Sequence, residues 1–176
     1  MDATSTTTMA TPVGELTLVA SADGLRAVLW PQEREGRVRL GQAADGGPAA
    51  EQVLAMARRE LEEYFAGTRT EFDVPLDPIG TEFQLRAWQV LRTIAYGRTI
   101  TYGEQARHLG GVEQSRAVGA ANGRNPISII VPCHRVVGST GKLTGFAGGL
   151  DTKAWLLAHE QAGGILRRCA PAQQPG

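Results

Sequence analysis

The sequence predicts an α/β protein with two parts, a small α/β unit followed by a mainly helical unit. A hairpin pattern over 13–30 and a helical pattern over 50–65 support the first part. Three closely spaced helix signals after residue 80 support the second part. The chain has 176 residues, of which 42% are hydrophobic and 20% charged, enough for one globular unit of up to two small domains. This composition excludes a disordered tail and a large multidomain machine.

The first unit begins with a predicted β-hairpin. Residues 15–19 partly alternate between apolar and polar, Asp23-Gly24 supplies a turn, and residues 25–30 form a second apolar strand. Residues 36–49 are rich in Gly and Ala and predict a mobile loop.

A helix follows over 50–65, where apolar residues recur at helical spacing and Gly67 is the expected stop. The stretch 67–80 contains two prolines and alternating polar residues, which predicts a strand followed by a linker. We therefore expect residues 1–80 to form a supporting domain with its linker.

Local signals divide the second unit into helices. Thr81–Gln84 and Thr101–Glu104 both have the form of a capping box, and the second opens a short helix that closes at Gly110-Gly111. A third helix is predicted from Glu113 to Asn122, and a final one over 153–161 carries Trp155, Leu156 and Leu157 into the core. Two short helices joined by a glycine turn and packed on a longer helix predict a helix-turn-helix.

We expect residues 81–165 to form one domain and residues 166–176, which include Cys169, to form a disordered tail without function. The opening residues are polar and lack the basic start and apolar middle of a signal peptide. The chain also lacks the run of about 18 apolar residues that a membrane helix requires. The prediction is a cytoplasmic protein that does not enter a membrane.

Charge is distributed unevenly, although Lys plus Arg and Asp plus Glu both number 18. Residues 1–80 carry 7 basic and 13 acidic side chains (net −6), whereas residues 81–176 carry 11 and 5 (net +6). The basic second half fits a polyanion such as nucleic acid, and it also fits a solvated basic face.

The third predicted helix presents almost no long polar side chains, because Arg116 is followed by small and apolar residues through Ala121. A helix that reads base edges in the major groove normally carries several Asn, Gln, Arg or Lys residues. Either its neighbours bury this helix, or it approaches a narrow minor groove only ~6 Å wide, where small residues avoid clashes. In the second case Arg116 is the side chain that reaches into the duplex.

The segment Pro132-Cys133-His134-Arg135 follows a short buried run and contains the candidate nucleophile. A cysteine beside apolar residues is usually an inert core residue. Here His134 and Arg135 bring a titratable base and a fixed positive charge, which lower the pKa of a thiol and favour the thiolate. Because adjacent side chains of an extended segment point to opposite faces, His134 would act through a water unless the chain bends.

Other candidate sites are weaker. Two cysteines and three histidines show no metal-binding spacing, so we predict neither a metal site nor a disulfide framework. The glycine-rich stretch 138–149 lacks the closing Gly-Lys-Ser/Thr of a phosphate loop. Its glycines allow close approach to a ligand, and Phe146 either offers a flat face to a ring or folds into the core. Glu160 by itself is typical of a solvated helix residue.

Four motifs together resemble the 6-O-alkylguanine-DNA alkyltransferases, also called methylated-DNA-protein-cysteine methyltransferases. They are Arg-Ala-Val-Gly from 116 through Asn125-Pro126, Ile-Ile-Val-Pro-Cys-His-Arg-Val-Val-Gly at 129–138, Gly-Gly-Leu at 148–150 and Trp-Leu-Leu-Ala-His-Glu at 155–160. The resemblance is dense over 81–160, and the hairpin and helix before it are similar to the family's N-terminal domain. It implies an α/β, RNase H-like first domain.

The resemblance implies a suicide DNA-repair protein that needs no cofactor and no metal. Its partner would be double-stranded DNA containing 6-O-alkylguanine, bound through the minor groove by the helix-turn-helix. The damaged base would be flipped out and its alkyl group transferred irreversibly to Cys133. His134 would take the thiol proton through a water, Glu160 would orient His134, Asn125 would brace the turn, and Tyr102 would protonate the departing guanine.

The resemblance also implies contact residues. The carbonyls of Cys133 and Val136 would bind the guanine amino group, the N–H of Ala147 would face the alkylated oxygen, and Arg116 would fill the gap left by the flipped base. The substrate-binding set is Val136, Phe146, Ala147 and Gly148; the DNA-binding set is Arg116, Ala117, Ala121 and Arg124. Tyrosine is common in the family where this chain has Phe146, so stacking is expected there without a hydroxyl contact.

This chemistry requires the Cys133 sulfur to lie at the mouth of a pocket and to be partly ionised. We expect a monomer in solution, and cooperative assembly on DNA is left open. An alternative function is a non-enzymatic binder of alkylated DNA that flags lesions for another repair pathway; the acceptor Cys133 counts against it. A cysteine hydrolase is a third, for which the sequence shows no oxyanion donor.

Overall fold

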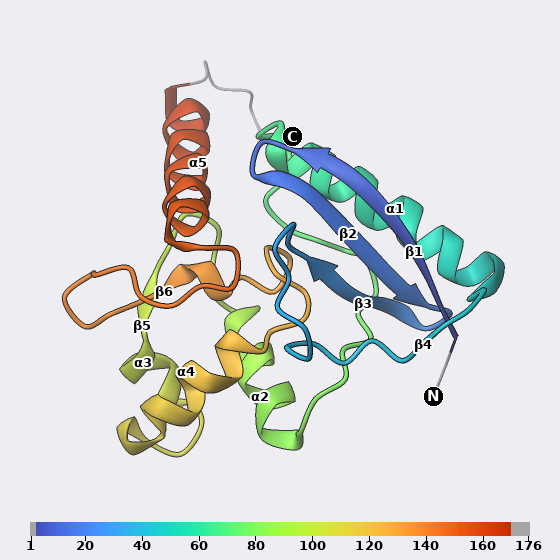
Figure 1. Cartoon of the computed structure of the whole chain (residues 1–176). Coiled ribbons are helices and arrows are strands. Elements are labelled where there is room, and N and C mark those ends of the chain that lie inside the picture. Colours follow the sequence, from blue (N-terminus) through green and yellow to red (C-terminus); the bar gives the residue numbers. More distant parts are fainter. Residues whose placement is uncertain (1–2, 170–176) are drawn as a thin grey trace.

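The computed structural model describes residues 3–169. A sheet packed against one long helix occupies the first half of the chain, and short helices with one longer helix occupy the second half (Figure 1). The predicted fold class, an α/β unit followed by a mainly helical unit, is confirmed.

The sheet has four strands, β1 (Ala3–Thr11), β2 (Gly14–Ser21), β3 (Gly24–Leu29) and β4 (Gln42–Ala43), in the order β3-β2-β1-β4. The strands β1, β2 and β3 pair antiparallel, and β4 runs parallel to β1. The predicted hairpin of β2 and β3 is confirmed. Strand β1 was not predicted: its threonines suit a strand because they are β-branched, but their polarity hides the alternation of apolar residues.

The helix α1 (Gly47–Phe65) covers the sheet. It begins at Gly47 rather than Ala50, with a proline in its first turn, and ends as predicted just before Gly67. Its buried residues recur at helical spacing and are Ala50, Val53, Leu54, Ala57, Glu60, Leu61 and Tyr64. Glu60 and Tyr64 make this stripe partly polar, so they need partners inside the molecule.

The predicted strand within 67–80 is wrong. This segment forms only an isolated bridge between Leu76 and Leu25, where Leu25 N donates to Pro75 O at 2.8 Å. Prolines limit pairing because they lack a backbone N–H. The buried carboxylate of Glu60 instead accepts hydrogen bonds from backbone N–H groups of the segment, including that of Val74 at 2.9 Å.

The helices α2 (Glu82–Leu91), α3 (Tyr102–Arg107) and α4 (Ser115–Gly123) begin close to the predicted positions. The Thr81 hydroxyl accepts from Gln84 N at 3.1 Å, and Thr81 N donates to the Gln84 side chain at 2.9 Å, which confirms the first capping box. A short 3₁₀ turn precedes α4. The glycines between α3 and α4 have φ angles of 121° and 141°, which other residues rarely adopt.

Buried side-chain hydrogen bonds fix these three helices against one another. The side-chain amides of Gln105 and Asn122 exchange hydrogen bonds of 3.0 and 2.8 Å, and Gln105 Nε2 also donates to Ala87 O at 3.2 Å. Trp88 Nε1 donates to Ala121 O at 2.8 Å. Because buried polar groups require such partners, this network specifies where α4 lies on α2 and α3.

The chain between α4 and Cys133 is buried but does not form a ladder strand. Ile127 bridges to Val28 of β3, and Ile129 has a positive φ of 75°, rare for a β-branched residue. The segment is followed by a 3₁₀ turn over Cys133–Arg135 and by β6 (Val136–Val137), which pairs parallel with β5 (Ile100–Thr101).

The helix α5 (Leu150–Cys169) is longer at both ends than the predicted 153–161. It includes 166–169, the start of the expected tail; residues 170–176 lie outside the described residues. Up to residue 163, its buried side chains are Lys153, Leu156 and Glu160. Of the three residues expected in the core, Leu156 is fully buried, Trp155 packs half-buried against the core, and Leu157 is half-buried.

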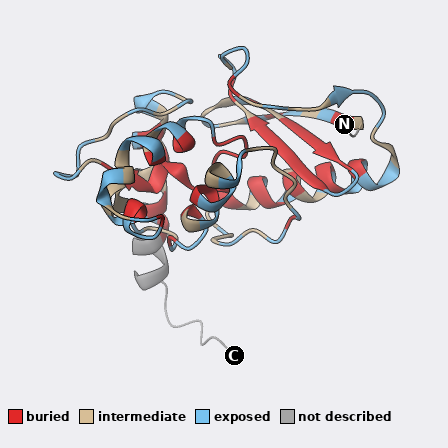
Figure 2. Cartoon of the chain, turned by 90° about the horizontal axis from the view of Figure 1, so that it is seen from below, coloured by how far each residue is buried: buried red, intermediate tan, exposed pale blue. Residues whose placement is uncertain are grey.

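Burial follows this arrangement of elements. Figure 2 shows buried residues along the strands and on the inner sides of the helices, with exposed residues on the outer loops. Within residues 3–169, no helix combines the length and the apolar character needed to cross a membrane.

Candidate active site and nucleic-acid interface

The turn Cys133–Arg135 places its three side chains in the interior. Cys133 is 8% exposed, His134 0% and Arg135 5%. The segment therefore bends at the cysteine rather than continuing as an extended strand, and His134 and Arg135 both reach Glu160 of α5. The expected solvated character of Glu160 is wrong, because its exposed fraction is 1%.

Glu160 is surrounded by donors. His134 Nε2 lies 2.6 Å from Glu160 Oε2, and Arg135 Nε and Nη2 donate to the carboxylate at 2.8 and 3.1 Å. The backbone N–H of Gly97 donates to Glu160 Oε1 at 3.3 Å, and the Tyr64 hydroxyl donates to Oε2 at 2.7 Å. Such complete satisfaction is what an ionised carboxylate needs inside a protein.

Burial, together with the charges of this cluster, determines the protonation state of His134. Burial alone would raise the pKa of Glu160, but hydrogen bonds from His134 and Arg135 and the charge of Arg135 hold the pKa well below its usual range. The pKa of His134 is lowered, mainly by burial, although Glu160 opposes this. A neutral His134 must then donate from Nε2 to the ionised carboxylate, which leaves Nδ1 as an unprotonated acceptor. Nδ1 has no hydrogen-bond partner among the described residues.

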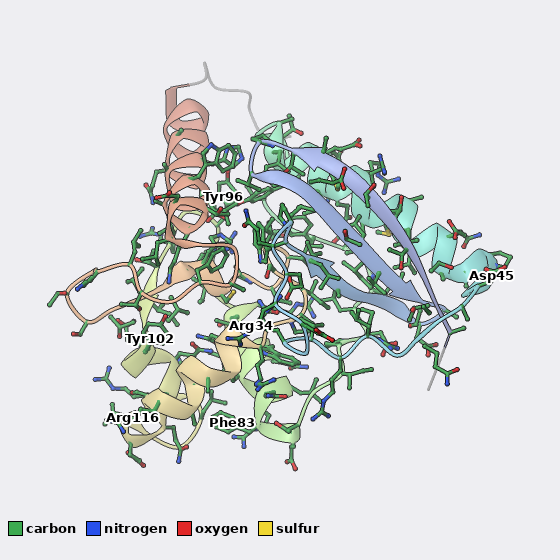
Figure 3. The ribbon with its side chains drawn as sticks, viewed as in Figure 1. Arg34, Asp45, Phe83, Tyr96, Tyr102 and Arg116 are labelled. Atoms are coloured by element: carbon green, nitrogen blue, oxygen red, sulfur yellow. The ribbon has the colours of Figure 1, made fainter. Side chains whose placement is uncertain are left out.

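Tyr64 is a functional residue that sequence reasoning missed. It lies on α1 of the first unit and is fully buried, and burial followed by the charge of Glu160 raises the pKa of its hydroxyl. The sequence showed it only as one apolar position of a helical pattern. Figure 3 shows the neighbouring Tyr96 beside α5; the rings of Tyr64 and Tyr96 lie 6.1 Å apart.

The Cys133 thiol differs from the expectation of partial ionisation. Burial raises the pKa of Cys133, while the Asn125 side chain and the charges of Lys153 and Arg37 lower it in part. His134 and Arg135 do not have the predicted acidifying effect, because Glu160 engages both. The free protein therefore favours the thiol, and a base must remove its proton before the sulfur can act as a nucleophile.

Asn125 braces the chain before the cysteine. It is fully buried; its Nδ2 donates to Val131 O at 2.8 Å and its Oδ1 accepts from Ile127 N at 3.1 Å. Its carbonyl accepts from Nη1 of Arg37, at 2.9 Å, an arginine of the loop after β3. The two units of the chain therefore share the support of this turn.

Lys153 is a second residue that sequence reasoning missed. Its ammonium group is buried and donates to Val136 O at 2.7 Å and to Thr144 O at 2.9 Å. It lies 5.9 Å from the centre of the Tyr102 ring. Burial lowers the pKa of Lys153, and Cys133 opposes this effect. Lys153, together with Arg37, thus supplies the positive charge near Cys133 that the sequence attributed to Arg135.

A cavity of about 510 Å³ opens beside these residues. Its lining comprises Gln32, Arg34, Arg37, Tyr102, Gly119, Gly123, Thr144, Gly145, Phe146 and Ala147. Cys133 is not among the lining residues, and this residue is 8% exposed. The Thr144 hydroxyl donates to Tyr102 Oη at 3.2 Å, and this pair connects the wall to Lys153.

The predicted substrate residues occupy different places. Phe146 and Ala147 line the cavity, and the ring of Phe146 meets Trp30 edge-on at 5.4 Å. A side chain at Gly148 would come within 2.8 Å of the Trp30 indole, so only glycine fits there. The Val136 side chain is buried, and its carbonyl already accepts from Lys153. Val136 N donates to the Cys133 carbonyl, so both predicted guanine acceptors have one partner.

Helix α4 combines the two possibilities left open by its sequence. Val118, Ala121 and Asn122 are buried, whereas Arg116 and Ala117 are exposed. The prediction that Ala121 contacts DNA is therefore wrong, because its side chain packs inside the molecule at 2% exposure. Ala120 is exposed instead, and so is Arg124 just after the helix. Arg116 projects at the start of α4 (Figure 3).

A metal site would need clustered ligands. Among residues 3–163, whose side chains the structure describes, no group of three or more His, Cys, Asp and Glu is placed to hold a metal ion.

Comparison with known proteins identifies the family. Residues 82–162 match the family model described as 6-O-methylguanine DNA methyltransferase, DNA binding domain, and residues 5–78 match its ribonuclease-like domain. The methylated-DNA–protein-cysteine methyltransferase of Methanosarcina acetivorans is 48% identical over 85% of this chain and 93% of that protein. The chain belongs to the 6-O-methylguanine DNA methyltransferase family.

Further comparisons agree with membership of the 6-O-methylguanine DNA methyltransferase family. The methylated-DNA–protein-cysteine methyltransferase of Mycolicibacterium paratuberculosis is 47% identical over 94% of this chain and 93% of its own length. The crystal structure of Mycobacterium tuberculosis OGT in complex with DNA matches with a TM-score of 0.78 at 45% identity, covering 89% of this chain and 92% of that chain. The resemblance inferred from the motifs and the ribonuclease-like character of the first unit are confirmed.

Proposed function

We propose that this chain repairs DNA by transferring the alkyl group of 6-O-alkylguanine to its own Cys133. The observation that carries the proposal is the Cys133–Arg135 turn backed by Glu160, in a member of a family whose relatives are named for this reaction. The chain is a monomer in solution, acts on double-stranded DNA and uses neither a metal nor a cofactor.

Proton removal comes first. The ionised Glu160 accepts the Nε2–H of His134 and so keeps Nδ1 available as a base. Nδ1 takes the thiol proton of Cys133 through a water, and the buried charge of Lys153 stabilises the thiolate that forms. Because Tyr64 and Arg135 also hold Glu160, the carboxylate keeps its position while His134 becomes charged.

Alkyl transfer follows. The thiolate attacks the alkyl carbon, a sulfur–carbon bond forms, and the bond from this carbon to the guanine oxygen breaks. Tyr102, which lines the cavity, protonates the departing guanine on its minor-groove ring nitrogen. A thioether is a very poor leaving group, so the alkyl group stays on Cys133 and each protein molecule acts once.

DNA is engaged through the exposed face of α4. The helices α3 and α4 and the glycine turn between them act as a helix-turn-helix, and the small exposed residues of α4 enter the minor groove. Arg116 fills the space left by the flipped guanine, whose extrusion costs a few kcal/mol. Since alkylation weakens base pairing, a damaged guanine leaves the stack more easily.

Stoichiometry tests this proposal. The protein is incubated with an excess of duplex carrying 6-O-methylguanine, and the peptide containing Cys133 is weighed by mass spectrometry. One methyl group on this peptide, and at most one repaired base per protein molecule, is the expected result. The control Cys133→Ser should bind the duplex without transfer, and Cys169→Ser should behave like the original chain.

Other outcomes would replace the proposal. An unmodified Cys133 peptide despite tight binding would favour a non-enzymatic binder of alkylated DNA. Repair well beyond one base per protein molecule would show a catalyst with turnover.

A further inference from the structure

Arginines gather where the loop after β3 meets the end of α4. Arg37, Arg39 and Arg124 line a cavity of about 210 Å³ together with Gly36, Ile79, Gln84 and Trp88. Arg34 and Arg37 also line the larger cavity of the candidate active site. Neither lining contains an acidic residue. Arginine side chains from two distant segments of the chain therefore converge on one surface.

Arg37 fixes this surface but does not form its exposed part. It is 5% exposed and pairs with the carboxylate of Glu33. Its Nη1 donates to Gly123 O at 3.2 Å and to Asn125 O at 2.9 Å. These bonds tie the loop of the first unit to the end of α4, so exposed arginines on the loop have a fixed position relative to α4.

The exposed arginines are Arg34, Arg39 and Arg124, which we name the arginine patch. Arg34 and Arg124 make backbone hydrogen bonds, but none of the three guanidinium groups has a hydrogen bond or ion pair with another described residue. Glu33 is occupied by Arg37 and by the backbone N–H of Trp30, at 3.1 Å. Glu35 is the one other acidic residue of the loop 31–41, and it is exposed. The three guanidinium groups of the patch are therefore exposed and unpaired among the described residues.

We propose that the arginine patch binds phosphate groups of the DNA backbone, so that the first unit of the chain contributes to duplex binding. Guanidinium groups match phosphate oxygens in shape and charge. The proposal rests on the proposed repair function, and its new element is the contact from Arg34 and Arg39.

Position along α4 supports this occupant. Arg116 lies at the start of α4 and Arg34 near its end (Figure 3), where Arg34 shares a cavity with Gly123. Helix α4 has 9 residues, which correspond to about 14 Å. Successive base pairs rise about 3.4 Å, so the patch would meet phosphates within roughly four base pairs of the flipped guanine.

Charge distribution supports the same occupant. The first 80 residues carry a net charge of −6, with only 7 basic side chains, and three of these, Arg34, Arg37 and Arg39, are in this loop. The rest of the first unit repels DNA, and the loop is where the duplex can approach it. Such an arrangement would orient the duplex on α4 as well as strengthen binding.

The test compares two double variants with equal loss of charge. Arg34→Ala/Arg39→Ala removes the loop part of the patch. Arg59→Ala/Arg92→Ala removes two exposed arginines that line neither cavity. Affinity for a duplex carrying 6-O-methylguanine, and for the same duplex undamaged, is measured from low to high salt.

For the patch variant we expect affinity to fall roughly 5- to 20-fold on both duplexes and the slope of log K against log salt to decrease by about 2. The control variant should keep the original affinity and the original salt slope. Glu35→Gln should raise affinity for both duplexes, because it removes the negative charge beside the patch.

Equal salt slopes in the patch variant and the control would overturn the proposal. A second outcome would also overturn it: the patch variant binds DNA as a single copy with unchanged affinity but loses cooperative binding. The patch would then contact the acidic face of a neighbouring copy rather than DNA. Methylation of the Cys133 peptide in the original chain is measured in the same samples. This measurement tests the repair function, and the salt slope tests the arginine patch, so the two proposals fail independently.

Discussion

The two sides of the Cys133–Arg135 turn are built differently. Behind it, the buried carboxylate of Glu160 accepts five hydrogen bonds from α1, the turn itself and the Gly97 loop. In front of it, a cavity of about 510 Å³ is walled by half-buried and exposed residues of the glycine-rich stretch 138–149 and by Tyr102. The side that handles the proton is fixed by buried hydrogen bonds, whereas the side that faces the substrate consists mainly of partly exposed residues.

Because of this difference, substitutions on the two sides of the turn should affect stability and alkyl transfer differently. Substitutions behind the turn should reduce both stability and transfer, because they leave buried charges or polar groups without partners. Substitutions in front should change transfer with little effect on folding. The following variants test the separation in order of decreasing effect.

Glu160→Gln should have the largest effect. It leaves the buried Arg135 without a carboxylate, and we expect a loss of about 3–5 kcal/mol in the free energy of unfolding, with transfer nearly abolished. Because the folded-state pKa of Glu160 is depressed, its stabilisation is present above the unfolded pKa of about 4.3 and is lost as pH falls through the folded value. Urea unfolding should therefore show that the free energies of unfolding of the original chain and of Glu160→Gln approach each other below about pH 4.

The exposed Glu62→Gln on α1 is the control for this variant, with an expected change within about 0.5 kcal/mol. A similarly small loss in Glu160→Gln would show that the cluster behind the turn is not a stabilising unit.

Lys153→Met should act mainly on the pKa of the Cys133 thiol, because Lys153 lies between the Glu160 cluster and the cavity wall. Removal of the ammonium group takes away a charge that lowers the pKa of Cys133, so the thiolate forms at higher pH. We expect transfer at neutral pH to slow by roughly tenfold and the rising limb of the rate–pH profile to move to higher pH. Lys142→Met, at an exposed position of the glycine-rich stretch, should leave the profile unchanged. A loss of rate without any shift of the profile would contradict this role.

Tyr64→Phe should have a smaller effect, about 1 kcal/mol of stability, because it removes one hydrogen bond to Glu160 and keeps the ring. With one donor fewer, the carboxylate accepts more strongly from His134, and the pKa of His134 should rise toward its ordinary value. The acidic limb of the rate–pH profile should move to higher pH. Phe65→Leu, which alters the same aromatic cluster without touching Glu160, should lower stability and leave that limb in place.

Phe146→Tyr should have the smallest effect. Phe146 is half-buried on the cavity, so an added hydroxyl can point to solvent, and we expect unfolding free energy to change by less than about 0.5 kcal/mol. Transfer from methylated duplex should stay within about twofold, as single-turnover kinetics would show. A loss of more than about 2 kcal/mol in the free energy of unfolding would mean that the cavity side of the turn is packed as tightly as the Glu160 side.

Much of the fold follows from signals that act within a few residues. The capping pair Thr81 and Gln84 and the spacing of apolar residues on α1 place helix ends because their hydrogen bonds and contacts are local. Strand β1 and the paths of 67–80 and 127–131 were not predictable in this way, since their partners lie in distant segments.

The chemistry divides along the same line. The neighbours Pro132-Cys133-His134-Arg135 and the surrounding motifs pointed to the family from the sequence alone. Which way His134 and Arg135 turn, that Lys153 and Glu160 lie inside, and that Tyr64 donates to Glu160 across 96 residues were decided only by the tertiary structure. From sequence alone, a polar residue on a helix is expected to be exposed to solvent. Its burial is favourable only where donors and acceptors from several elements meet, and the tertiary structure decides where they do.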